Sequence, residues 1–182
     1  MRQDNSRKNR VAVLVAALAA LSAVAAFAAA TAAADDGQSA DIRTITGSFC
    51  NDATHAFCLQ ASFGSQTVEG YCAGTISSCT PNANSGGTLM LRPGDYLLSV
   101  NDSSKFHDFT LRSCPDSTAP CDESSGGTEQ PITTDPFVGS ASTVIHLSHG
   151  TYRLFCGNDG PPIHEDKGMY VDISVGGVGQ LG

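Results

Sequence analysis

The sequence predicts an all-β protein with a Greek-key sandwich fold, and three observations support this. Short runs rich in β-branched, aromatic and leucine residues recur, turn signals separate them, and no segment after the N-terminal region has a long helical period. The expected strands cover residues 88–91, 95–100, 107–111, 142–147, 151–155 and 169–175. The expected turns cover residues 92–94, 102–104, 148–150 and 157–162. Such spacing, without heptads or internal repeats, is typical of two packed antiparallel sheets.

The first 34 residues have the pattern of a secretory signal peptide. Basic residues come first, and an apolar stretch of small residues follows from Val11 to Ala34. We expect cleavage near Ala34 and an extracytoplasmic protein that is secreted, periplasmic or associated with the cell wall. Because the apolar stretch is long enough to span a bilayer, an uncleaved membrane anchor is the alternative.

The charge of the chain restricts its partners. The net charge is −8, and loss of the leader removes four basic residues and one acidic residue, which leaves about −11 on the mature chain. Nucleic acids and anionic lipid surfaces would repel such a protein, whereas a protein partner with a basic face would be attracted at low salt. The alternative is that the acidity only keeps a secreted protein soluble.

Seven cysteines are an odd number, so one remains outside any set of intramolecular disulfides. Residues 35–86 form a cysteine-rich N-terminal extension, and residues 113–137 form a long loop; both are expected to be held by disulfides rather than by packing. The predicted disulfides are Cys114–Cys121 in the loop and, as a guess from local spacing, Cys50–Cys58 and Cys72–Cys79 in the extension. A zinc site made of the four cysteines in the extension is the less favoured alternative.

The remaining cysteine lies in a group of residues suited to one-electron copper chemistry. Cys156, His164 and Met169 lie on one loop between two expected strands, and His107 lies upstream at the start of another. A soft thiolate, two imidazoles and a weak thioether are the side chains that blue-copper sites use. Taken singly, each of these residues is more often a core or surface residue, but the combination and its order favour copper.

At these residues the chain resembles the cupredoxins, the small type 1 (blue) copper proteins that include plastocyanin and azurin. The resemblance is carried by GDYLLSVNDSSKFHDFTL and by GTYRLFC, the histidine that follows it and GMYVDISV, and it is strongest to plastocyanin-like or azurin-like domains secreted by bacteria. It implies a cupredoxin domain over residues 87–182, with His107, Cys156 and His164 as strong copper ligands and Met169 as the weak axial ligand. His164, which follows two prolines and an isoleucine, is expected to be exposed and to serve as the electron port.

One departure from the family pattern affects the expected chemistry. Asp108 follows the first histidine where the family usually has asparagine, whose amide ties the two ligand loops together. A carboxylate can still accept backbone hydrogen bonds, but its charge would favour Cu(II) and lower the reduction potential. Two acidic residues, Glu165 and Asp166, also follow His164 where many relatives are apolar.

These observations predict a monomeric one-electron carrier for a redox protein partner, with one copper ion and no enzymatic activity. The alternatives are a copper-binding or copper-storage protein and a metal-free interaction module. Enzymatic motifs such as GxSxG, HExxH and a glycine-rich phosphate loop are absent from the sequence, and no pair of acidic residues is placed for acid and base catalysis. The other histidines, His55, His146 and His149, are interpreted as structural.

Overall fold

The computed structural model describes residues 43–50, 55–115, 119–134, 136–158 and 160–176. The predicted signal peptide, its cleavage near Ala34 and the alternative of a membrane anchor fall outside these residues. Within them, no helix has the length and apolar character needed to cross a membrane.

The described residues form strands and two short 3₁₀ helices, and they contain no α-helix. The strands are β1 (Arg43–Phe49), β2 (His55–Phe63), β3 (Gln66–Thr75), β4 (Ser78–Ser85), β5 (Leu89–Leu91), β6 (Gly94–Asp102), β7 (Thr110–Pro115), β8 (Thr128–Pro131), β9 (Gly139–Leu147), β10 (Gly150–Phe155) and β11 (Tyr170–Val175). The 3₁₀ helices are η1 (Glu123–Ser125) and η2 (Glu165–Lys167). Each of the six predicted strands is present, with the third beginning at Thr110 rather than at His107.

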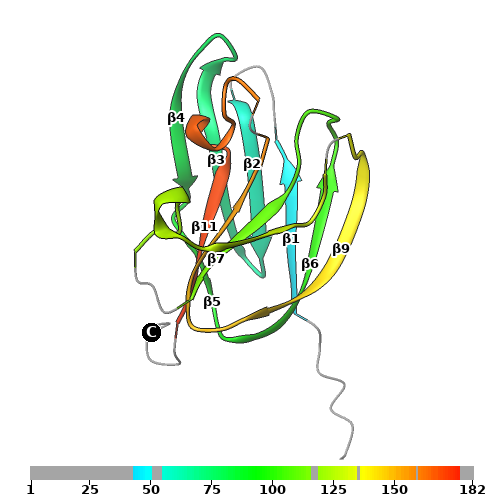
Figure 1. Ribbon diagram of the computed structural model, residues 1–182, viewed down its shortest axis with the longest axis vertical. Coiled ribbons are helices and arrows are strands. Elements are labelled where there is room, and N and C mark those ends of the chain that lie inside the picture. The colour runs from blue at the N-terminus through cyan, green and yellow to red at the C-terminus, as the bar shows by residue number, and fades with distance from the viewer. Residues whose placement is uncertain (1–42, 51–54, 116–118, 135, 159, 177–182) are drawn as a thin grey trace, which may run out of the picture. The chain divides into compact units, whose positions relative to one another are not determined.

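The strands form two sheets that pack face to face (Figure 1). The larger sheet has the order β4-β3-β2-β1-β6-β9, and the smaller has the order β5-β11-β10-β7-β8. The pairs β1–β6 and β5–β11 are parallel, and the other pairs are antiparallel. The chain changes sheet five times: between β4 and β5, β5 and β6, β6 and β7, β8 and β9, and β9 and β10. The predicted fold class, an all-β Greek-key sandwich, is confirmed.

The N-terminal extension is part of the sandwich core. Residues 43–85 supply β1 to β4, and Ile45, Leu59 and Val68 are buried in the same core as β10 and β11. The expectation that disulfides rather than packing hold this segment is therefore wrong. Polar and glycine-rich composition concealed strands whose inward positions are apolar at alternate residues.

All three predicted disulfides are present. They join Cys50 to Cys58, Cys72 to Cys79 and Cys114 to Cys121. The zinc site considered for the extension is therefore excluded, because its four cysteines are oxidised. The long loop between β7 and β9 also contains η1 and the short edge strand β8, which no pattern in the sequence predicts.

The two sheets approach each other very closely at Gly70, in β3. A Cβ atom at this position would meet the backbone carbonyl oxygens of Gly168 and Tyr170, just before and at the start of β11. The absence of a side chain therefore lets the end of the loop that carries His164 lie directly on β3.

We expect Gly70→Ala to lower the free energy of unfolding by about 1–3 kcal/mol, because the added methyl group must push two backbone carbonyls away. Urea unfolding followed by circular dichroism measures the change. Ala73→Ser, at an exposed position of the same strand, is the matched control and should stay within about 0.5 kcal/mol of the unmutated protein. An unchanged stability for Gly70→Ala would contradict the close approach.

Candidate metal centre

The pairing of three strands brings the predicted ligand residues to one end of the smaller sheet. Central strand β10 pairs with β7 on one side and β11 on the other, with Phe155 opposite both Thr110 and Tyr170. Cys156 therefore follows β10 at the level where Met169 precedes β11 and the His107 loop enters β7. A backbone hydrogen bond of 3.2 Å from the Cys156 amide to the Met169 carbonyl closes this end.

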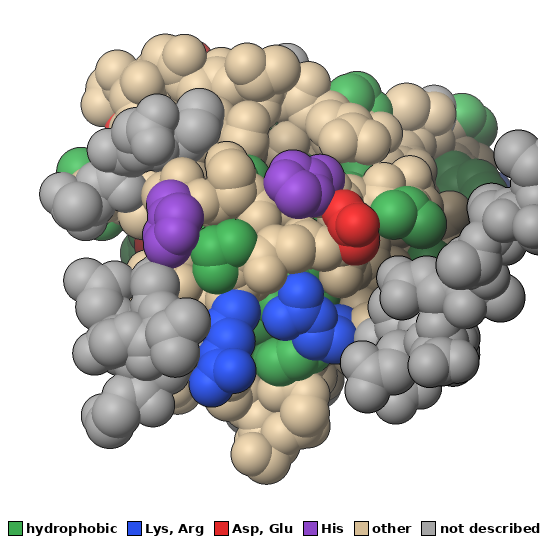
Figure 2. Space-filling view, turned by 90° about the horizontal axis from the view of Figure 1, so that it is seen from below, with side chains coloured by type: hydrophobic (Ala, Val, Ile, Leu, Met, Phe, Trp, Pro, Cys, Tyr) green, Lys and Arg blue, Asp and Glu red, His purple; other side chains and the backbone are tan. Residues whose placement is uncertain are grey.

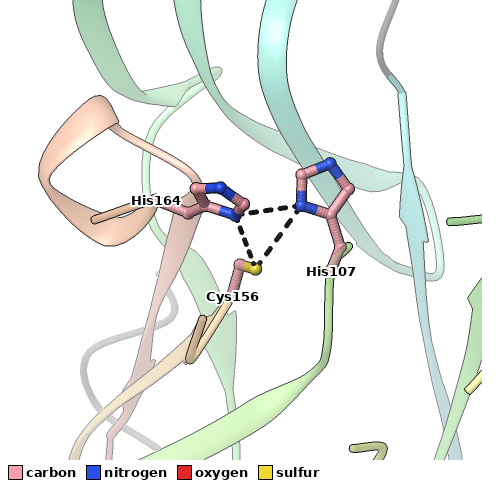
Figure 3. A group of neighbouring side chains, drawn as sticks. All are labelled: His107, Cys156 and His164. Carbon is pink, nitrogen blue, oxygen red and sulfur yellow. Dashed lines mark hydrogen bonds between the residues drawn. The ribbon is translucent and has the colours of Figure 1, made fainter. Parts of the chain in front are cut away.

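Three donor atoms of this group converge on one point (Figure 3). The Nδ1 atoms of His107 and His164 lie 3.0 Å apart. The sulfur of Cys156 lies 3.6 Å from the first of these nitrogens and 3.2 Å from the second. All seven cysteines lie in the described part of the chain, and Cys156 is the one that is outside a disulfide.

The group is shielded from water. Cys156 is 1% exposed, His107 7% and His164 8%. Burial, together with the neighbouring His164 imidazole, lowers the pKa of His107 to about 4. The His107 imidazole is therefore neutral at pH 7, which is the form that binds metal ions.

The fourth predicted ligand, Met169, lies next to the group along the backbone. Its amide donates a 3.2 Å hydrogen bond to the His164 carbonyl, and its carbonyl accepts the bond from Cys156. The side chain is fully buried. The thioether as an axial ligand stays a prediction.

Two hydrogen bonds tie the His107 loop to the Cys156 loop. The Asp108 carboxylate accepts a hydrogen bond from the Gly157 amide, and the Asn158 side-chain amide donates one of 2.9 Å to the Phe106 carbonyl. The prediction that the Asp108 carboxylate can accept a backbone hydrogen bond is confirmed. Both loops are thus held together close to the donor atoms.

A buried ion-pair network anchors the loop that carries His164. Arg112 in β7 lies directly opposite Arg153 in β10, an arrangement in which like charges repel. Glu165, the residue after His164, lies between them: it accepts bonds of 2.7 and 3.0 Å from Arg112 and one of 2.9 Å from Arg153.

Further partners complete this network. Arg112 also binds Glu129, and Arg153 binds Asp172 at 2.7 and 3.2 Å. Burial alone would lower the pKa of Arg153, but its hydrogen bonds and charge interactions with Asp172 and Glu165 raise it overall. Both guanidinium groups are almost fully buried and stay charged, so Glu165 has a fixed position.

The expectation of an exposed His164 is wrong, because its side chain is buried. The neighbours that precede it, Pro161, Pro162 and Ile163, are exposed instead, as is Phe106 on the facing loop. The Pro161–Pro162 peptide bond is cis. Apolar residues therefore form the surface next to the imidazole, while the imidazole itself lies beneath them.

The other described histidines are outside the group. His55 packs edge-on against Tyr71, His146 pairs with exposed Asp95, and His149 is exposed before β10. Strands β6 and β10 begin at the end of the sandwich opposite the donor atoms, and Figure 2 views this end, with histidine side chains at its surface.

The donor set fits a soft or borderline metal ion. Thiolate sulfur and imidazole nitrogen select copper or zinc rather than the hard cations magnesium and calcium. Every buried side-chain nitrogen and oxygen atom in the described residues has a hydrogen-bond partner, the histidine nitrogens of this group included.

The sequence pattern indicates the donor residues but not the residues that hold them. Glu165 stands out in the sequence only for its charge. Arg153 lies in the expected strand 151–155, Arg112 directly follows the expected strand 107–111, and neither arginine was assigned a role. The available signal is one arginine in the middle of a predicted core strand and another directly after a second predicted strand, where a buried cation needs an acidic partner. Phe49 and Phe57, which cover the imidazoles at ring-centroid distances of 4.9 Å, were not considered.

No known protein family matches the chain, and no curated protein matches its sequence. Among solved structures, the chain is similar to reduced rusticyanin, determined by NMR, with a TM-score of 0.39 and 16% sequence identity over 73% of this chain and 76% of that chain. A likeness this distant says nothing about the metal centre. The finer expectation of a plastocyanin-like or azurin-like domain stays a prediction.

We expect Glu165→Gln to lower the free energy of unfolding by about 2–3 kcal/mol, because it removes the negative charge that separates two buried guanidinium groups. Asp166→Asn, at the exposed next position, is the matched control and should change stability by less than about 0.5 kcal/mol. Urea unfolding of the metal-free variants decides the question. Equal stabilities of the two variants would show that Glu165 does not hold the network together.

Proposed function

We propose that this chain is a secreted type 1 (blue) copper protein that carries single electrons between redox partners. His107, Cys156 and His164 would be the strong ligands and Met169 the weak axial ligand. The observation that carries the proposal is the convergence of a buried thiol and two imidazole Nδ1 atoms within hydrogen-bonding distance of one another. When bound, the copper ion supplies the one-electron couple Cu(II)/Cu(I).

The protein's own contribution is a rigid and dry frame. The proposed ligands lie near strand ends of one sheet or, for His164, on the loop between β10 and β11. Two hydrogen bonds tie the His107 and Cys156 loops together, and the ion-pair network fixes the residue after His164. A frame that holds its donor atoms in one arrangement limits the reorganisation that accompanies a change of oxidation state. This suits an electron carrier better than a storage protein, which must release its metal ion.

The surroundings of the ligand loop fit a basic redox partner. The chain has a net charge of −8, and an open groove beside the loop includes the acidic residues Asp122, Glu123 and Asp166 in its lining. Exposed Ile163 also lines this groove, and exposed Phe106 directly precedes His107 in the chain. Acidic residues would steer the encounter, and the apolar surface would bring the partner close to the imidazole edge.

The proposed location follows from the oxidised cysteines. Three disulfides indicate an oxidising compartment, which agrees with export by the predicted leader. The mature protein would act as a monomer outside the cytoplasm.

We expect the copper-loaded protein to show an intense thiolate-to-copper absorption band in the visible region and a narrow hyperfine splitting in its Cu(II) electron paramagnetic resonance spectrum. Cys156→Ser should abolish both signals, because it removes the sulfur ligand. His146→Ala, which removes a histidine at the opposite end of the sandwich, should leave both unchanged. Tight Cu(I) binding without the visible band would support storage instead, and absence of copper binding would support a metal-free module.

We expect Asp108→Asn to raise the reduction potential by on the order of 50 mV, because a neutral amide replaces a negative charge that favours Cu(II). The asparagine oxygen can still accept the Gly157 amide hydrogen bond, so the change isolates the charge. Asp166→Asn should give a smaller rise, because that exposed carboxylate is screened by water and salt. Protein-film voltammetry measures both shifts, and a fall for Asp108→Asn would contradict the role of its charge.

A further inference from the structure

Two phenylalanine rings from the N-terminal strands cover the two imidazoles. The ring of Phe49, the last residue of β1, lies 4.9 Å from the His107 ring, and the ring of Phe57 in β2 lies 4.9 Å from the His164 ring. Each phenylalanine immediately precedes a cysteine of the Cys50–Cys58 disulfide. We call these four residues, Phe49, Cys50, Phe57 and Cys58, the aromatic clip.

Phe57 has a backbone conformation that a phenylalanine rarely adopts. Its φ is +51°, in the left-handed region, and the pairing of β2 with β3 is irregular between Ala56 and Leu59. Residues held in this region are strained, and they persist where the surrounding structure imposes the conformation. A bulge of this kind redirects a side chain, and here the redirected ring lies against His164.

The disulfide supplies the constraint that this conformation needs. Cys58 follows Phe57, and its sulfur is bonded to Cys50. The Cys50 amide also donates a 3.0 Å hydrogen bond to the Cys58 carbonyl, so the ends of β1 and β2 are joined twice. Phe49 is further held by stacking on Phe109, a fully buried core residue, at a ring-centroid distance of 4.3 Å.

We propose that the aromatic clip is a lid that positions the two imidazoles and keeps water away from the Cys156 sulfur. The rings close the side of the donor group that faces the larger sheet, while β10 and the ligand loop supply the other side. The N-terminal strands therefore have a functional part in the metal centre as well as a place in the core. The lid exists in the metal-free protein, and only its effect on copper rests on the proposed function.

If copper is bound, the lid favours the reduced state. A thiolate with Cu(I) is neutral overall, whereas a thiolate with Cu(II) carries one net positive charge. Removal from water disfavours the charged form more than the neutral one. Opening the lid should therefore stabilise Cu(II) and lower the reduction potential.

The first experiment tests the lid without metal. Phe57→Gly removes the ring and relieves the backbone strain, because glycine adopts positive φ readily. Phe63→Ala is the matched control: it removes a partly buried ring that packs against Tyr96, at the other end of the same strand. Each protein is treated with iodoacetamide in its metal-free, disulfide-intact form, in which Cys156 is the thiol that can react.

We expect iodoacetamide to alkylate Cys156 at least about tenfold faster in Phe57→Gly than in the unmutated protein. The alkylation rate in Phe63→Ala should differ from that of the unmutated protein by less than about twofold. The acceleration should not depend on urea below the unfolding transition, which separates local opening from global unfolding. Should Phe57→Gly fail to fold, Phe57→Asn takes its place, because asparagine also tolerates the left-handed region. Equal alkylation rates in Phe57→Gly and the unmutated protein would contradict the proposal that the aromatic clip shields Cys156.

The second experiment tests the disulfide. The double variant Cys50→Ser/Cys58→Ser should reproduce the faster alkylation, and adding Phe57→Gly to it should give little further change, because both remove the same lid. The double variant Cys114→Ser/Cys121→Ser, which removes a bridge of similar loop length from the opposite end of β7, should leave the rate unchanged. Additive effects of the ring and the disulfide would show that the bridge does not hold the ring.

The third measurement separates the lid from the proposed function. In copper-loaded protein, Phe57→Gly should lower the reduction potential by about 59 mV, which corresponds to a tenfold shift of the one-electron equilibrium towards Cu(II). An unchanged potential would overturn the electrostatic effect of the lid. If the unmutated protein binds no copper, the proposed function fails, and the alkylation rates alone still decide whether the lid exists.

Discussion

The structure depends above all on the pairing of β10 with its two neighbours. Because Phe155 lies opposite both Thr110 and Tyr170, three chain segments end at the same level of one sheet. A shift of one residue in either pairing would turn the side chains of a whole strand to the other face. The thiol of Cys156 would then lie away from both imidazoles. The register of this small sheet is therefore the constraint that makes a metal centre possible, and the core of the sandwich enforces it.

The same register brings two buried positive charges together, and an acidic residue of the ligand loop offsets their repulsion. It places Arg112 opposite Arg153 within the buried part of the sheet, where two positive charges repel strongly. Glu165 neutralises this repulsion, and it does so from the residue that follows His164. The loop can therefore close correctly only when Glu165 pairs with the two buried arginines. A loop that moved away from the metal centre would leave two guanidinium groups short of a partner, and this resists opening.

Much of the fold and part of the site could be predicted from the sequence. All the described strands after residue 87 except β8 are visible because their apolar runs are bounded by turn residues, and the disulfides follow from short spacings. Strands β1 to β4 were missed because polar residues dilute their alternation and the bulge at Phe57 interrupts it. Cys156, His107 and His164 were found by residue type and order. The contact of Glu165 with two arginines depends on which strands are neighbours, and no local pattern encodes that.

The three disulfides explain how one thiol stays reduced beside six oxidised cysteines. Each bridge joins cysteines only seven or eight residues apart, so each pair closes a short loop, which carries a small entropic cost. Cys156 has no cysteine near it in sequence, and in the folded chain it lies 1% exposed beneath aromatic rings and imidazoles. Thiol–disulfide exchange requires direct access of one sulfur to another. Local pairing of the other six cysteines and burial of Cys156 therefore act together. The pairing leaves no other thiol to form a disulfide with Cys156, and the burial keeps outside sulfur atoms away from it. A buried thiol can in this way persist in an oxidising compartment and remain available as a metal ligand.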